Sequence, residues 1–178
     1  MSIRLVVNAD DLGVRADIDA GILEAHDRGV VTSATALVGG AAFAATAARL
    51  RGTKLGLGVH LALSGDLPTC APASDVPALL DPDTGRLPRK WPVAAAKWLT
   101  ARLPAEQVRR EWEAQLARAL DHGLAIDHVD SHEHVHAFPG LWEQAVLAAA
   151  RFGVRRLRRP VEPPFGPGPL GGGVKRLA

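Results

Sequence analysis

Asp130-Ser-His-Glu-His-Val-His136 places an aspartate and three histidines within seven residues, directly after the strand-like run at residues 125–129. In an extended backbone alternate side chains share one face, so the aspartate and the three histidines are expected on the same side. Imidazole nitrogens and carboxylate oxygens at that spacing are what a divalent metal ion requires as ligands. The alternative is a solvated, histidine-rich loop that binds no metal.

An acid pair closes the first apolar run of the chain. Arg4-Leu-Val-Val-Asn-Ala-Asp-Asp11 ends at two adjacent aspartates, Asp10 and Asp11. A buried strand that delivers acids to its C-terminal end is a common way to build a site in an α/β protein. Two adjacent ionised carboxylates repel each other, and a metal ion bound to one relieves that repulsion and leaves the other free as a base. The alternative is an Asp-Asp turn that caps a helix.

A third segment, Leu55-Gly-Leu-Gly-Val-His-Leu-Ala-Leu63, alternates bulky apolar residues with small ones. One face of the expected strand is apolar and suited to packing under helices, and the other is nearly bare except for His60. A lone histidine on a strand is usually a hydrogen-bonded core residue. His60, however, falls late in its strand, as the acid pair and His132 do in theirs. Three strands that each end in a potential ligand form a more specific signal than any one segment.

Taken together, these segments resemble the YdjC-like carbohydrate deacetylases, a family that includes the chitooligosaccharide deacetylases and a hopanoid-biosynthesis-associated branch. The resemblance runs from residue 3 to about residue 160, in the order and spacing of the family. It implies a distorted (β/α) barrel and a divalent-metal-dependent N-deacetylase. The motifs that carry it are Val7-Asn-Ala-Asp-Asp-Leu-Gly13, Val31-Thr-Ser-Ala-Thr-Ala-Leu-Val38, Gly58-Val-His-Leu61 and His128-Val-Asp-Ser-His-Glu-His-Val-His136.

Carried over residue by residue, the resemblance implies a site with defined roles. Asp11, His60 and His132 would be the ligands of one divalent metal ion, Zn²⁺ or Mg²⁺. Asp10 would be the neighbouring catalytic carboxylate. The substrate implied is an N-acetylated amino sugar or sugar conjugate. Family members usually continue through further strands and another histidine motif, so the C-terminal part of the family fold is expected to be missing.

The chemistry of this ligand set predicts roles for the neighbouring residues. Two neutral imidazoles and one carboxylate suit Zn²⁺, whereas Mg²⁺ prefers more oxygen ligands and waters. Asp10 is expected to take a proton from the attacking water, with Asn8 on the same strand face to orient it. His134 or His136 is expected to protonate the departing amine. Asp130 is expected to fix the tautomer of an imidazole ligand.

Strand-like and helix-like segments alternate along the chain, which predicts a parallel sheet with all strand C-terminal ends on one side. Five strands are too few to close an eight-stranded barrel, so the expected fold class is α/β, a partial or distorted (β/α) TIM-like barrel. A helix is predicted to begin at Pro104 and to end before Gly123, with Trp112 in the core. The expected strands are 3–8, 32–37, 55–63, 126–130 and 154–158, and the other expected helices are 16–28, 41–51 and 140–152.

A single metal-hydrolase domain is expected over residues 1–160, followed by a Pro/Gly-rich tail at 161–178. The stretch 64–92 is rich in proline, aspartate and glycine, and we expect an irregular loop that forms a wall of the substrate site or else an ordinary surface excursion. An open barrel leaves strand edges and apolar helix faces exposed, which favours a homo-oligomer.

Composition argues against several other classes of protein. The formal net charge is +2 and no basic run carries interleaved aromatic residues, so nucleic-acid binding is not expected. The basic cluster at residues 155–159 is expected to be a strand with flanking charges. Cys70 is the only cysteine, which excludes a disulfide framework. No apolar run approaches the roughly 20 residues needed to span a membrane. The first strand follows Met1 too closely for a signal peptide, so a cytoplasmic location is expected.

Two rival interpretations remain open from the sequence. One is another metal-dependent amidase or a phosphoesterase with the same type of site. A phosphate substrate would need basic residues beside the ligands, and the sequence near them offers chiefly Arg15. The other is a metal-binding remnant with little activity.

Overall fold

The computed structural model describes residues 5–160 of the 178-residue chain, so the expected tail at 161–178 lies outside the described residues. Within that range the strands form one parallel sheet in the order β1-β2-β3-β4. The strands are β1 Asn8–Leu12, β2 Ser33–Ala36, β3 Gly56–Leu61 and β4 Ile126–Ser131. The helices are α1 Ala16–Asp27, α2 Phe43–Leu50, α3 Trp91–Leu99, α4 Ala105–Asp121 and α5 Leu141–Arg151, with 3₁₀ turns η1 Pro77–Leu79 and η2 His132–Ala137.

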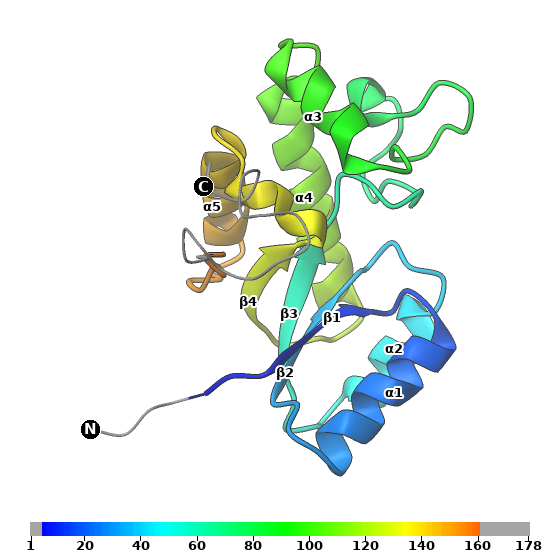
Figure 1. The fold of residues 1–178 in the computed structure, drawn as a ribbon, viewed down its shortest axis with the longest axis vertical. Helices are drawn as coiled ribbons and strands as arrows, with labels where there is room; N and C mark the ends of the chain where they lie inside the picture. Colours follow the sequence, from blue (N-terminus) through cyan, green and yellow to red (C-terminus); the bar gives the residue numbers. More distant parts are fainter. Residues whose placement is uncertain (1–4, 161–178) are drawn as a thin grey trace, which may run out of the picture.

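Helices cover the apolar face of the sheet. Leu57, Val59 and Leu61 on β3 are at most 7% exposed, as the alternation in this segment predicts. Helix α4 packs against both β3 and α5 and buries Trp112 completely, so the prediction that Trp112 is a core residue is confirmed. Figure 1 shows α1 and α2 together beside β1 and β2, α4 running behind the sheet at β3, and α5 beyond β4. In that described part of the chain no helix has the length and apolarity to cross a bilayer.

The opposite face of the sheet carries small and polar side chains. The parallel register pairs Thr35 with Gly58 and His60 with Asp130, so these residues point to one side from neighbouring strands. Gly58 leaves room for a side chain of β4, because a Cβ on Gly58 would lie 2.6 Å from Nε2 of His128. The polar face is therefore available for a site.

An irregularity in β1 lies at the acid pair. The register with β2 shifts between Ala9 and Leu12, and Asp11 has a φ of 65°. Aspartate tolerates this left-handed region better than most residues, and a bulge redirects the side chains beside it. The expected strand at 3–8 is therefore displaced: β1 includes the acid pair instead of ending before it.

The loops after β1 and β2 are packed against each other just beyond the acid pair. The carbonyl of Gly13 accepts a hydrogen bond from the amide of Ala42 at 3.0 Å. A Cβ on Gly40 would lie 2.2 Å from that same carbonyl oxygen, so only glycine fits there. The buried carboxylate of Asp19 on α1 accepts hydrogen bonds from the amide of Gly13 and from the hydroxyl of Thr46 on α2. These contacts hold the loop that follows Asp11 in one position.

The connection between β3 and α4 contains a helix that we did not predict. Residues 64–90 are irregular apart from η1, as expected, but α3 begins at Trp91, where Pro92 occupies the first turn. Nε1 of Trp98 donates a hydrogen bond to the carbonyl of Pro139 at 2.9 Å, and Trp91 packs edge-on against Phe138. The buried residues of α3 are the small Ala94 and Ala95, so its sequence carries no clear apolar repeat of large side chains.

The irregular part of the same connection is anchored to α4 by one buried carboxylate. Glu111 is fully buried and accepts hydrogen bonds from the amides of Cys70 and Ala71, and from Nε2 of Gln115. Gln115 in turn bonds both backbone groups of Ala62, just after β3. The long loop is therefore held close to the end of β3 by α4.

Two expected elements have a different structure. Residues 132–137 are not extended but form η2, in which Glu133 and His134 have φ values of 54° and 55°. The prediction that the aspartate and all three histidines share one strand face is therefore wrong, because left-handed residues interrupt the two-residue alternation. The expected strand at 154–158 is also wrong, since that segment forms a single parallel bridge between Leu157 and Val129. Pro160 has no amide hydrogen with which to extend the pairing.

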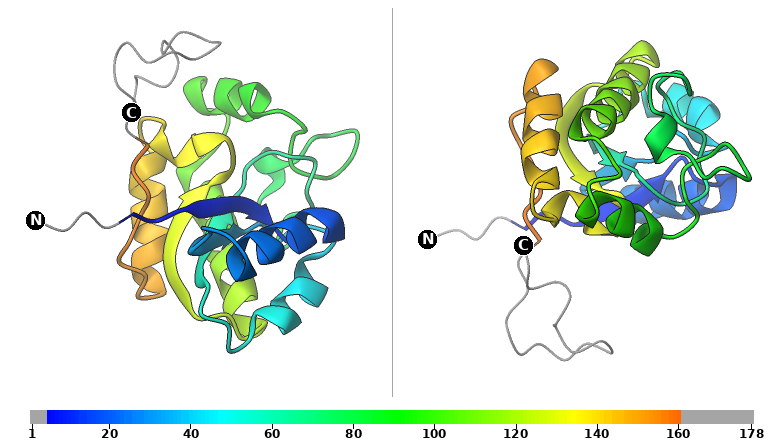
Figure 2. Two further views of the ribbon diagram at one scale, coloured as in Figure 1. Left: turned by 60° about the horizontal axis from the view of Figure 1, so that its bottom comes forward. Right: turned by 90° about the horizontal axis from the view of Figure 1, so that it is seen from above.

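The sheet formed by the described residues is open, with β1 and β4 at its edges, and a closed barrel is not formed. The two views in Figure 2 show the segment after α5 running back along that helix, and the Val129–Leu157 bridge joins it to β4. The remaining boundaries agree with the predicted elements to within two residues.

Candidate metal centre

Three ligand-type side chains from separate segments meet at the C-terminal edge of the sheet. Asp11 lies on β1, His60 on β3, and His132 directly follows β4; their ligand atoms lie within 4.8 Å of one another. Oδ1 of Asp11 lies 3.1 Å from Nδ1 of His132 and 3.5 Å from Nε2 of His60. The structure thus brings together the three residues that the sequence analysis expected as metal ligands.

The charges of this group favour an ionised carboxylate. The hydrogen bond from His132 holds the pKa of Asp11 below its usual value, and the same bond raises the pKa of His132. A carboxylate must be ionised to bind a cation, so the surroundings of Asp11 keep it in the competent state.

Asp130 determines which nitrogen of His60 faces the other ligands. Nδ1 of His60 lies 2.6 Å from Oδ1 of Asp130, and both residues are buried. Burial raises the pKa of Asp130, but hydrogen bonds from His60, Arg158 and Thr35 outweigh it and hold that pKa below its usual value. An ionised Asp130 accepts a hydrogen bond from Nδ1–H of His60. The lone pair on Nε2, on the side that faces Asp11, is then free to bind a metal ion. This is the arrangement expected for Asp130.

Asp10, the expected base, is held from two sides. Nδ2 of Asn8 donates a hydrogen bond to Oδ1 of Asp10 at 2.6 Å, as the shared strand face predicts. Nη1 of Arg158 lies 3.0 and 3.1 Å from the two carboxylate oxygens of Asp10. The Asp10 carboxylate therefore has a defined orientation next to Asp11.

Sequence reasoning missed two residues of this centre. The hydroxyl of Thr35 lies 3.3 Å from Nδ1 of His60 and 3.3 Å from Oδ2 of Asp130, and it also approaches Asp10 at 3.4 Å. The sequence signal for Thr35 was its position between two alanines of β2, which places its hydroxyl on the opposite face of the strand from theirs. Arg158 lies in a run of similar arginines, and nothing local distinguishes it from its neighbours.

The two remaining histidines of η2 differ in their surroundings. His136 is fully buried, with Nδ1 bonded to the hydroxyl of Ser131 and Nε2 lying 2.7 Å from the carbonyl of Arg158. Burial lowers the pKa of His136. With both nitrogens occupied, His136 holds the backbone in place and is not poised to protonate a substrate. His134 is half-buried, and neither group of ligand atoms found within residues 5–160 includes it.

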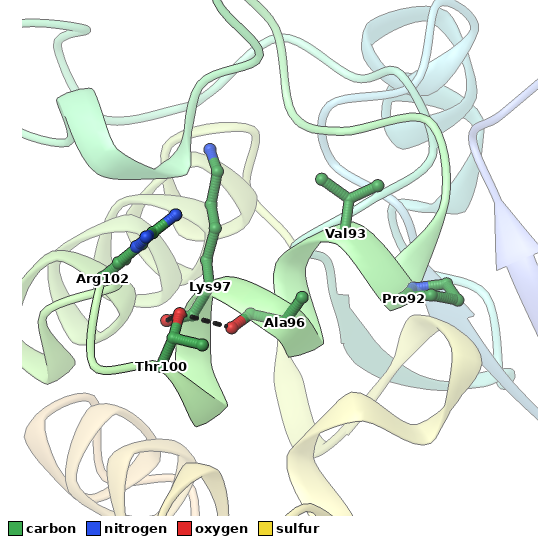
Figure 3. Close-up of a pocket in the computed structure, with 6 residues that line it drawn as sticks. All are labelled: Pro92, Val93, Ala96, Lys97, Thr100 and Arg102. Atoms are coloured by element: carbon green, nitrogen blue, oxygen red, sulfur yellow. Dashed lines mark hydrogen bonds between the residues drawn. The ribbon is translucent and has the colours of Figure 1, made fainter.

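A surface pocket of about 450 Å³ lies along α3 and the turn after it (Figure 3). Lys97 contributes an amine to the lining, but Nζ of Lys97 already donates hydrogen bonds to the carbonyls of Ala78 and Leu80. None of the residues around His60 lines this pocket. The lining residues are Pro92, Val93, Ala96, Lys97, Thr100 and Arg102.

Comparison with known proteins identifies the family. The family model described as "YdjC-like protein" matches residues 4–172, a range that includes every residue of the candidate centre. The chain belongs to the YdjC-like protein family. This confirms the resemblance seen in the four sequence motifs.

Curated relatives of this YdjC-like chain are longer than it is. A carbohydrate deacetylase of Brevibacillus brevis is 41% identical over 139 residues, which are 78% of this chain and 52% of the relative. A chitooligosaccharide deacetylase of Enterobacter sp. is 39% identical over 152 residues, which are 84% of this chain and 57% of the relative. The chain thus spans little more than half the length of these relatives.

A solved structure shares the fold. A crystal structure from Enterococcus faecalis, of a protein provisionally described as a cellobiose-phosphate cleavage protein, aligns with a TM-score of 0.74 and 33% identity. The alignment covers 85% of this YdjC-like chain and 57% of the other chain. The parallel α/β arrangement found here is therefore the arrangement of that family neighbour.

Proposed function

We propose that the protein is a divalent-metal-dependent hydrolase that removes acetyl groups from N-acetylated amino sugars or sugar conjugates. The observation that carries the proposal is the convergence of Asp11, His60 and His132 within 4.8 Å at the C-terminal edge of a parallel sheet. The names of the curated relatives, carbohydrate deacetylase and chitooligosaccharide deacetylase, indicate the substrate class.

The donor set fits one metal ion. Two imidazoles and one carboxylate, with open coordination positions, suit Zn²⁺ better than Mg²⁺. When bound, such an ion supplies Lewis-acid chemistry: it polarises a carbonyl and lowers the pKa of water. We therefore propose one Zn²⁺, held by Asp11, His60 and His132.

The residues around these ligands supply the proton chemistry. We assign to Asp10 the role of accepting the proton of the attacking water, which its fixed orientation by Asn8 and Arg158 beside Asp11 supports. His60 keeps one tautomer because Asp130 accepts its Nδ1 proton. We assign to His134 the proton that the departing amine requires.

The proposal also covers the domain organisation, architecture, cellular location and oligomeric state of the protein. We propose that residues 1–160 form one domain with the architecture of a partial TIM-like barrel, and that it is a cytoplasmic protein that self-associates. The open sheet supports the partial barrel, and the lone Cys70 supports a reducing compartment. Self-association is supported by exposed apolar residues on α5, which are Trp142, Val146 and Leu147.

A phosphoesterase ranks second. Arg158 lies beside the ligands and adds a cation there, which the sequence did not predict. Its guanidinium, however, already pairs with the carboxylates of Asp10 and Asp130, so it is not free to bind a phosphate. A metal-binding protein with little activity is the third candidate.

The test is acetate release from N-acetylglucosamine oligomers by the zinc-loaded protein. The expected result is metal-dependent release that is lost in Asp11→Asn and His132→Ala, with both variants folded by circular dichroism and depleted of zinc by elemental analysis. Asp83→Asn, which alters an exposed loop carboxylate, is the matched control and should retain zinc and activity. Wild-type protein that binds zinc but releases no acetate would overturn the deacetylase proposal. Full zinc content in both ligand variants would overturn the ligand assignment.

A further inference from the structure

The candidate metal centre contains a second group of ligand atoms. Among the described residues, Asp10, His60 and Asp130 also bring ligand atoms within 4.8 Å of one another. This second group shares His60 with the first, but it uses the opposite side of the imidazole, where Nδ1 faces Asp130. Its two carboxylates, Asp10 and Asp130, could attract a second cation, although Nδ1 of His60 is engaged by Asp130.

A protein cation already contacts both carboxylates of the second group. Nη1 of Arg158 lies 3.0 and 3.1 Å from the oxygens of Asp10 and 3.1 Å from Oδ2 of Asp130. One nitrogen thus touches three carboxylate oxygens of two residues. A guanidinium keeps its charge at every ordinary pH, so the cationic partner of this pairing does not titrate.

The backbone of Arg158 is fixed by β4 and η2. Its amide donates to the carbonyl of Val129 at 3.0 Å, and its carbonyl lies 2.7 Å from Nε2 of His136. Nδ1 of His136 is bonded in turn to Ser131 at the end of β4. The guanidinium is therefore carried to the carboxylates by an anchored segment, although its side chain remains 40% exposed.

The charges of the whole centre balance only when Arg158 is counted. Asp10, Asp11 and Asp130 contribute three negative charges, and His60 and His132 are neutral when they bind a metal. One divalent ion and one guanidinium neutralise the three carboxylates. Without the guanidinium, the Asp10–Asp130 pair would keep an uncompensated charge in a partly buried place, which is unfavourable.

We infer that Arg158 is the resident cation of the Asp10–Asp130 carboxylate pair and holds the centre to a single metal ion. The inference rests on the proposed metal role of Asp11, His60 and His132, and not on the identity of the substrate. Arg158 acts here as a positioning residue: it orients Asp10 and occupies the place of a second cation.

The test is the metal stoichiometry of variants that remove the guanidinium but keep the length of the stem. Metal-free protein is titrated with Zn²⁺ by calorimetry, and bound zinc is counted by elemental analysis at the same free concentration. Wild type and Arg158→Lys are expected to bind one equivalent, whereas Arg158→Met and Arg158→Gln bind a second, weaker equivalent. Arg156→Met is the matched control, because this neighbouring arginine pairs only loosely with Asp127, at 3.8 Å, and should leave the stoichiometry at one.

A double variant locates the additional ion. In Arg158→Met/Asp10→Asn the second equivalent should disappear while the first remains, because Asp10 belongs only to the second group. The inference is overturned if Arg158→Met and Arg158→Gln both saturate at one equivalent, or if the second equivalent survives Asp10→Asn. Either outcome leaves the proposed function intact, whereas a wild-type protein that binds no zinc would overturn both.

Discussion

Nδ1 of His60 lies 2.6 Å from Oδ1 of Asp130, and the Asp130 side chain is fully shielded from solvent. The bond crosses from β3 to β4 between residues that the parallel register places side by side. Because Asp130 accepts a hydrogen bond from Nδ1–H of His60, the other nitrogen of His60 is directed toward Asp11, 3.5 Å away. Asp130 of β4 therefore sets which nitrogen of His60 on β3 is available to a metal ion.

Asp130→Asn should weaken zinc binding by about 10–100-fold, the usual effect of losing a carboxylate that orients a histidine ligand. The asparagine amide cannot accept the Nδ1 proton with the strength of a carboxylate, so the required tautomer loses its support. Competition with a chromophoric chelator measures the dissociation constant. Asp127→Asn, which changes an exposed carboxylate on the same strand, should bind zinc as the wild type does. Equal affinity in Asp130→Asn would show that Asp130 does not orient His60.

Asp10→Asn should leave zinc binding largely intact and reduce turnover by roughly 10²–10⁴-fold, the scale of a positioned acid or base. The amide keeps the shape of the side chain and still faces Asn8, but it cannot accept a proton. Steady-state acetate release and zinc content are measured on the same preparations. Turnover near that of the wild type would assign Asp10 a structural role.

Two glycine substitutions should change stability in opposite directions. Gly40→Ala places a Cβ 2.2 Å from the Gly13 carbonyl oxygen and should destabilise the protein by about 1–3 kcal/mol or more, the cost of overpacking. Gly21 lies within α1 and a Cβ there meets nothing within 4 Å, so Gly21→Ala should stabilise by about 0.5–1 kcal/mol. Urea unfolding measures both. Equal stability of the two variants would contradict the close contact between the loops after β1 and β2.

Glu111 should give the stability a measurable dependence on pH. Burial raises the pKa of Glu111 above its unfolded value, although hydrogen bonds from Cys70, Gln115 and Ala71 oppose the shift. The native state then holds this proton more tightly than the unfolded state. The contribution of Glu111 to the free energy of unfolding therefore falls as pH rises from about 4.3, the unfolded value, through the native pKa.

Glu111→Gln removes this titration and serves as the comparison. The stability of the wild type relative to Glu111→Gln should be greatest below about pH 4.3 and should decline as pH rises. Urea unfolding of both proteins at matched pH values gives the difference. A difference that stays constant or grows with pH would contradict the raised pKa.

Self-association should appear as a mass that increases with protein concentration in light scattering. The open edges of the sheet and the exposed apolar residues of α5 provide the surface, and a typical specific interface buries about 1,600 Å² in total. Val146→Lys on α5 should shift the protein toward the monomer, whereas Leu99→Lys, at an exposed site on α3, should not. A wild-type protein that stays monomeric at all concentrations would overturn the proposed self-association.

Much of the site was predictable because strand ends carry their own signal. Asp10-Asp11, His60 and His132 each follow or end an apolar run, and parallel strands bring such ends to one edge. The alternation of leucine with glycine before His60 predicted which face of β3 would be bare. The four-residue repeat of Val108, Trp112, Leu116 and Leu120 likewise indicates the inner side of α4. The first three are fully buried, whereas Leu120 is 42% exposed.

The conformation of the histidine-rich segment was not predictable from its spacing. Alternating histidines are compatible with a strand, but η2 replaces the strand at His132 because Glu133 and His134 adopt left-handed backbone angles. The result is that His132 faces Asp11, while His136 turns inward to Ser131 and the carbonyl of Arg158. Local sequence does not encode the contacts with Asp11 and with the carbonyl of Arg158, because these two partners come from other segments.

The sequence alone therefore determined most of the order of strands and helices, the apolar faces, and the strand ends at which Asp10, Asp11, His60 and His132 lie, because each depends on short-range periodicity or on the geometry of parallel sheets. The choice of Asp11, His60 and His132 as the three ligands came from the resemblance to the YdjC-like family. Tertiary structure alone decided the partners of those residues. Arg158 reaches Asp10 across 148 positions of the chain, and Thr35 reaches Asp130 across 95. Such contacts depend on how the sheet curves and where its loops are anchored, and no local pattern distinguishes Arg158 from the arginines beside it.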